Sequence, residues 1–139
     1  MRLETIDHAL SDRLRRASAD ERVRAAHVAC NFAVRRSEVD QKAVREALNI
    51  LLLGEVAKSS VLSELEVLVR QLDAEYFSLG NATQGSPALL RFSQARAIQS
   101  LVFAMSAPNL ESTADAVYEA AMSLEEPLPL LRAVWGAVG

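Results

Sequence analysis

Apolar residues recur along this chain at intervals of three and four positions, which is the period of an α-helix with one buried face. The helical stretches cover residues 4–16, 18–35, 39–57, 59–79, 87–106 and 112–124, and a short last one ends at residue 138. Turn-forming residues are scarce, with only 5 Gly and 4 Pro. The pattern predicts an all-α fold, a compact bundle of six or seven helices. A length of 139 residues suits one helical domain spanning 1–139.

Residues that favour helix ends mark several of these boundaries. Residues 18–21 (Ser-Ala-Asp-Glu) have the spacing of a capping box, and residues 37–40 (Ser-Glu-Val-Asp) repeat this start signal. Residues 86–87 (Ser-Pro) place proline at the first position of a helix, where it is favoured. Gly80 suits the position just after a helix, and Pro108 is expected to end the helix before it.

Two segments are more apolar than a helix with one buried face requires. Residues 87–106 carry apolar side chains around nearly the whole helix circumference, which predicts the central and most buried helix of the bundle. Residues 50–53 (Ile-Leu-Leu-Leu) cover every side of one helix turn. We therefore expect neighbouring helices to enclose this turn as well.

The composition is that of a globular protein, with 50% hydrophobic and 24% charged residues. The single cysteine, Cys30, excludes an intramolecular disulfide and fits a reducing compartment. Residues 1–7 lack the apolar core of a signal peptide, and the longest aliphatic run, residues 50–53, is far shorter than the ~20 residues of a membrane span. The expected location is cytoplasmic, with no membrane partner.

Candidate chemistry is sparse. His27 and Cys30 lie one helix turn apart, but zinc would need further ligands and His8 is the only other histidine. Packing within an apolar stripe is therefore the favoured interpretation of this pair. Gly80 and Gly85 fit no phosphate-binding motif, and no nucleophile elbow occurs in the sequence. We expect neither enzymatic activity nor a metal or other cofactor.

Charge is unevenly distributed along the chain. Residues 1–36 hold eight Arg and five acids, a balance of +3, whereas residues 37–139 hold seven bases and thirteen acids, a balance of −6. The basic segment raises nucleic-acid binding as a hypothesis. Because Asp12, Asp20 and Glu21 are interleaved with the arginines, local ion pairs are the favoured interpretation, and a nucleic-acid partner is not expected.

The stretch at 112–124 has two distinct faces. The apolar face is formed by Leu110, Ala114, Val117, Ala121 and Leu124. The other face is formed by Glu111, Asp115, Glu119 and Met122, with Tyr118 at its border. Its three acids recur at every fourth position, where like charges cost about 0.2–0.5 kcal/mol per pair. This outward face tolerates the repulsion and also carries Met and Tyr. We therefore take it as the candidate binding site for a basic protein. The alternative interpretation is an acidic face that contacts only water.

Three segments carry a resemblance to a known class of protein. They are Arg22–Ala33 (RVRAAHVACNFA), Ala95–Ile98 (ARAI) and Ala116–Ala121 (AVYEAA). These segments are rich in alanine and arginine and have helical spacing. In these respects they resemble small all-helical bacterial immunity proteins of interbacterial toxin systems. The resemblance implies a protein that neutralises a cognate toxin by direct binding, often through an acidic surface when the toxin is a basic nuclease.

Three functions are therefore considered. The leading hypothesis is a non-catalytic helical protein-binding domain, of which an immunity protein is one form. The alternative is a helical regulatory or small-ligand-binding domain, which could form a homodimer through the apolar surface of the third to fifth helices. Nucleic-acid binding through the Arg-rich N-terminal helices is third.

Overall fold

A computed structural model describes residues 1–55, 58–80, 85–106 and 109–139. Within them the chain forms seven α-helices, one 3-10 turn and no strand, which confirms the predicted all-α bundle. The elements are η1 (Arg2–Thr5), α1 (His8–Arg15), α2 (Ala19–Arg36), α3 (Lys42–Leu53), α4 (Ser59–Leu79), α5 (Pro87–Ser106), α6 (Leu110–Met122) and α7 (Leu128–Val138).

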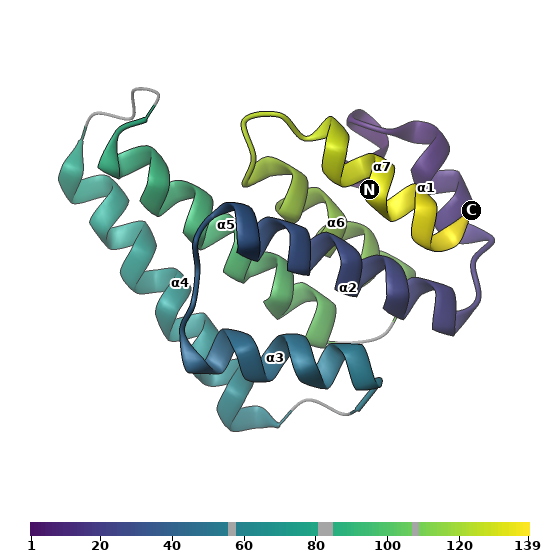
Figure 1. Ribbon diagram of the computed structural model, residues 1–139, viewed down its shortest axis with the longest axis horizontal. Coiled ribbons are helices and arrows are strands. Elements are labelled where there is room, and N and C mark those ends of the chain that lie inside the picture. The colour runs from purple at the N-terminus through teal and green to yellow at the C-terminus, as the bar shows by residue number, and fades with distance from the viewer. Residues whose placement is uncertain (56–57, 81–84, 107–108) are drawn as a thin grey trace.

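Helices α2 and α5 organise the bundle. Helix α5 packs against α4, α6, α2 and α3, while α2 packs against α7 and α6 as well as α5 and α3. In Figure 1, α4 and α5 form a hairpin at one side of the molecule, and α1, α7 and both chain ends gather at the other. Contacts with four other helices confirm that α5 is central.

The core lies where α2, α5 and α6 meet. From α5 it receives Ala95, Ile98 and Leu101, all fully buried. Burying a side chain of the size of Leu or Ile stabilises the fold by about 1.5–3 kcal/mol. The first two turns of α5 are less enclosed, since Leu90 and Phe92 keep part of their surface exposed. Apart from Ala88, the buried residues of α5 therefore lie between Ala95 and Val102.

Several predicted helix ends are confirmed. The Ser18 hydroxyl accepts a hydrogen bond from the Glu21 N–H at 3.1 Å, and the Glu21 carboxylate accepts one from the Ser18 N–H at 2.8 Å. The Leu89 N–H donates to the Ser86 hydroxyl at 3.2 Å at the start of α5. Gly80 follows α4 with a φ of 78°, a conformation that favours glycine.

Two predicted starts are wrong. The first stretch is divided because the Asp7 carboxylate accepts from the Leu10 N–H at 3.0 Å, so that α1 begins only at His8. Ser37 does not start α3 but follows the end of α2, where its N–H donates to the Ala33 carbonyl oxygen. The chain then turns at Glu38, whose φ is 59°, and α3 begins at Lys42.

The expectation that neighbours enclose residues 50–53 is also wrong. Leu51 is buried, but Leu52 and Leu53 are 61% and 60% exposed. Neighbouring helices contact only one side of this last turn of α3, which ends at Gly54 with a φ of 68°. The predicted third helix is also too long, because Gly54 and Glu55 are not helical. Its predicted continuation over 56–57 and the predicted helix end at Pro108 lie outside the described residues.

We expect the capping box of α2 to make stability depend on pH. The Ser18 backbone N–H and, after it, the Arg13 guanidinium lower the pKa of Glu21 from 4.5 to about 2. Because the folded-state pKa lies below the unfolded value, the contribution of Glu21 is complete above pH ~4.5 and is lost as the pH falls towards 2. The free energy of unfolding in urea should therefore decline more steeply over that interval in wild type than in Glu21→Gln.

The matched control for this experiment is Asp20→Asn. It removes a carboxylate from the same turn but leaves the contacts of Glu21 in place, so its stability should follow the wild-type pH dependence more closely. Parallel pH profiles for wild type and Glu21→Gln would contradict the prediction.

Candidate functional site

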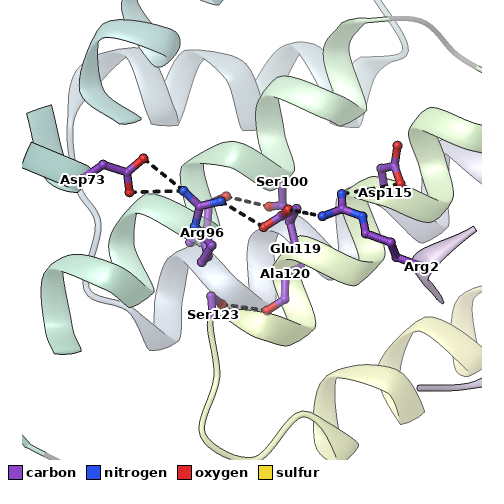
Figure 2. Close-up of polar contacts among 9 residues, drawn as sticks. Arg2, Asp73, Arg96, Ser100, Asp115, Glu119, Ala120 and Ser123 are labelled. Carbon is purple, nitrogen blue, oxygen red and sulfur yellow. Dashed lines mark hydrogen bonds and ion pairs between the residues drawn. The ribbon is translucent and has the colours of Figure 1, made fainter. Parts of the chain in front are cut away.

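Glu119 lies at the centre of a network of charged side chains that links four elements of the fold (Figure 2). Its side chain is only 6% exposed. One carboxylate oxygen accepts from Arg2 Nη1 at 3.0 Å, and the other from Arg96 Nη1 at 3.4 Å. The outward orientation predicted for Glu119 is therefore wrong, because this residue turns to the interface of α6 with α5.

The network continues from both arginines. Arg96 Nη2 donates to both carboxylate oxygens of Asp73 on α4 at 3.2 Å. Arg2 Nη2 lies 3.6 Å from Asp115, and its guanidinium carbon lies 4.6 Å from the centre of the Tyr118 ring. Acidic and basic side chains thus alternate from α4 through α5 and α6 to η1. The two arginines therefore offset the repulsion that was expected among the acids of α6.

The five residues of the predicted partner site do not share one exposed face. Glu111 is exposed, whereas Asp115 and Tyr118 are half-buried beside Arg2 and Glu119 is buried. Met122 is half-buried and lines a cavity instead. Binding of a partner by these residues stays a prediction. The prediction was based on an acidic outer face of α6, but of the three acids only Glu111, in the first turn, is exposed.

Cys30 is a core residue, as its position in an apolar stripe indicated. It is fully buried, and the Ser100 hydroxyl lies 3.4 Å from its sulfur. Burial raises the pKa of the Cys30 thiol to about 12, which leaves it protonated and unreactive at neutral pH. Among the residues that the structure describes, no group of three or more His, Cys, Asp or Glu side chains could hold a metal ion.

The arginines of the N-terminal helices make contacts within the chain. Arg13 pairs with Glu21 at 2.7 Å and also donates to the Val138 carbonyl oxygen, while Arg15 pairs with Glu4. These contacts join α1 to α2, α7 and η1. Of the acids predicted to pair with these arginines, Glu21 does so, whereas the contact between Arg13 and Val138 joins distant parts of the chain.

Two adjoining cavities open between α5, α6 and the end of α2. The larger has a volume of about 600 Å³, and its apolar lining is Leu89, Leu90, Phe92, Met122 and Leu124. The smaller, of about 340 Å³, is lined partly by Arg36 and Ser37. The two cavities share Leu90, Ser93, Ser123, Leu124 and Glu125 in their linings, and we call them together the α5–α6 hollow.

Large hydrophobic side chains are exposed mainly along α3 and α4. Of the six found in the described part of the chain, only Leu128 lies elsewhere, on α7. The other five define what we call the α3–α4 edge: Leu52, Leu53, Val67, Phe77 and Leu79. A groove of about 410 Å³ between the two helices adjoins Val67 and has further apolar lining from Ala43 and Leu68.

Phe77 is the most exposed member of this edge, with 77% of its surface accessible. Its ring centre lies 5.3 Å from that of Tyr76, which lies 5.5 Å from that of Phe92 on α5. Among the described residues, the main packing partners of α4 are α5 and α3, and much of its remaining surface is exposed. The sequence holds a signal for this surface, because Val67 and Phe77 fall outside the apolar stripe of α4.

Comparisons with protein-family models, with curated proteins and with solved structures find no match to this chain. A search of the helices in the described ranges finds none with the length and apolarity needed to span a membrane.

We expect replacement of Glu119 to destabilise the fold strongly. Glu119→Ala leaves the guanidiniums of Arg2 and Arg96 facing each other without their shared carboxylate. Breaking buried ion pairs in this way costs about 2–4 kcal/mol, allowing for the partial exposure of both arginines. Urea unfolding at pH 7 measures the change. The matched control is Glu111→Ala, since Glu111 is an exposed acid on the same helix. This variant should change the free energy of unfolding by about 0.5 kcal/mol or less. Equal losses of stability in both variants would contradict the role of Glu119 in the network.

Cys30 should react with thiol reagents only when the protein unfolds. Its burial excludes the reagent, and a pKa of about 12 keeps the thiol protonated. A colorimetric disulfide reagent at pH 8 measures the number of reacting thiols. The Ser63→Cys variant adds an exposed cysteine on α4 as an internal control. One thiol should then react at once and the second only with added urea, and immediate reaction of both would show that Cys30 is accessible in the folded state.

Proposed function

We propose that this chain is a non-catalytic protein-binding domain and that the α3–α4 edge is its contact surface. The observation that supports this is the exposure of Phe77, with 77% of its surface accessible, on the same helix as the exposed Val67 and Leu79. Large apolar side chains left exposed on a folded protein are available for association with another protein. Aromatic side chains contribute most to such contacts because they bury large areas with few rotatable bonds.

The charge of α4 supports a basic partner. Four acids against one arginine leave a balance of −3 over Ser59–Leu79. Glu64 and Glu66 are both exposed and flank Val67. A second copy of the chain would bring two acidic α4 helices together, whereas a basic protein would find opposite charge around its apolar contact.

An immunity protein fits this proposal. The resemblance of Arg22–Ala33 and of the two shorter segments to helical immunity proteins supports a toxin as the partner. A basic toxin would meet the acids of α4 and insert an apolar side chain beside Phe77. The contact would then lie on α4 rather than on the predicted face of α6.

A comparison of three tagged proteins tests the proposal. Wild type, Phe77→Glu and Leu128→Glu are expressed in the native host, and the proteins that co-purify are identified by mass spectrometry. Leu128 is the matched control because it is 53% exposed but lies on α7, outside the edge. We expect a basic protein to be recovered with wild type and Leu128→Glu and to fall at least tenfold with Phe77→Glu. Equal recovery with all three would contradict the proposal.

Two further measurements complete the test. Circular dichroism should show the same helix content in all three proteins, since both replaced side chains are exposed. Light scattering at two concentrations measures self-association. A dimer that Phe77→Glu returns to a monomer would identify a second copy of the chain as the occupant of the edge and would overturn the proposal of a basic partner.

A further inference from the structure

Helix α4 carries apolar side chains on two opposite sides. The buried residues of α4, on the side that packs into the bundle, are Val61, Leu65, Val69 and Leu72. Val67, Ala74 and Phe77 are exposed, and they lie seven and three positions apart, so they follow the opposite side of the helix. We call these three residues the outer face of α4. It extends about 15 Å along the helix axis.

The free charges beside the outer face are few and well placed. Two of the four acids of α4 are already paired with arginines of α5. The other two, Glu64 and Glu66, are exposed and form no ion pair within the described part of the chain. By helical spacing they lie on the two sides of Val67. Arg70, one turn further along, is exposed and has no carboxylate partner among the described residues either.

The shape of the outer face favours a helix as the segment that binds it. The described ranges contain no strand to which an extended segment could add through backbone hydrogen bonds. Two helices pack through side chains spaced three, four and seven residues apart, which is the spacing that the outer face offers. Ala74 lies between the two larger side chains, and its methyl group lets a second helix backbone come close.

The groove between α3 and α4 continues this face towards α3. Its volume is about 410 Å³, and Val67, Leu68 and Ala43 form its apolar lining. Glu64 lines the same groove. A helix that lies on α4 would place an apolar side chain in the groove and a basic one beside Glu64. From the groove to Phe77 such a contact covers about four helix turns.

We propose that the partner contributes an amphipathic α-helix that packs lengthwise on the outer face of α4. Its apolar side chains lie against Val67, Ala74 and Phe77, and its basic side chains lie beside Glu64 and Glu66. This inference rests on the proposed function, because it specifies which kind of segment the basic protein places on the α3–α4 edge.

Three synthetic peptides test the shape and the charge of the partner separately. The first, the lysine peptide, has three heptads of Leu-Ala-Lys-Leu-Lys-Ala-Lys, which place the leucines on one helix face and lysines beside them. The second has glutamate in place of every lysine. The third is the lysine peptide with proline in place of the last alanine of the middle heptad, which breaks the helix but keeps the charge.

Binding to the folded protein is measured at pH 7 and low salt by the fluorescence anisotropy of each labelled peptide. We expect the lysine peptide to bind at least about tenfold more tightly than the other two. Its mixture with the protein should also show more helix by circular dichroism than the sum of the separate spectra, because a short peptide is only marginally helical alone.

Four variants locate the contact. Ala74→Gln places a longer, uncharged side chain at the point of closest approach and should weaken binding of the lysine peptide at least about fivefold. The matched control is Ala9→Gln, which changes an exposed alanine on α1 and should bind as wild type does. Glu66→Gln should weaken binding about two- to fivefold, and Arg70→Gln should strengthen it by a similar factor, because each changes one charge beside a basic helix.

The outcomes separate this inference from the proposed function. Equal binding of the lysine peptide and its proline form, unchanged affinity in Ala74→Gln, or no binding of the lysine peptide to wild type would each overturn the inference. Unchanged affinity in both charge variants would overturn the position of the basic side chains. If Phe77→Glu still loses the co-purified basic protein in any of these cases, the proposed function stands and only the helical form of the partner is wrong.

Discussion

The close approach of α2, α5 and α6 is the constraint on which the rest of this structure depends. Alanines at the crossing points make it possible, because a methyl side chain lets helix backbones come near each other. Ala29, Ala33, Ala95, Ala97 and Ala120 are all fully buried. With few large side chains to separate the helices, polar residues beside these alanines are enclosed as well. Glu119 directly precedes Ala120 on the buried side of α6.

Burial of Glu119 in turn determines how the N-terminus and α4 are held. A carboxylate taken out of water costs more than one ion pair returns, unless several donors surround it. Arg96 supplies one donor from α5, and Arg2 supplies another from η1. Each arginine has a second carboxylate, on α4 or on α6, so one buried charge connects the outer hairpin to the first residues of the chain.

The α3–α4 edge and the α5–α6 hollow both lie where this core ends. Helix α4 has 21 residues, and in the described part of the chain its main neighbours are α5 and α3, which leaves Phe77 and Val67 exposed. The first two turns of α5 extend past the core towards the end of α6, and the hollow lies between them. Both surfaces thus arise from helices that are longer than the core that covers them.

The helical class, the central place of α5 and the capping box at Ser18 could be predicted from the sequence, because each depends on residues within four positions of one another. The repeat of apolar positions and the spacing of Ser18 and Glu21 are local properties of this kind. The exposure of Leu52 and Leu53, the burial of Glu119 and the position of Ser37 at a cavity wall were decided by tertiary structure. Each depends on groups distant in the chain: Arg2 is 117 residues from Glu119, and Ser37 meets the hollow through residues of α5 and α6. Helical periodicity identifies which side of a helix is apolar, but which helix covers that side, and how far along its length, is determined only when the helices pack.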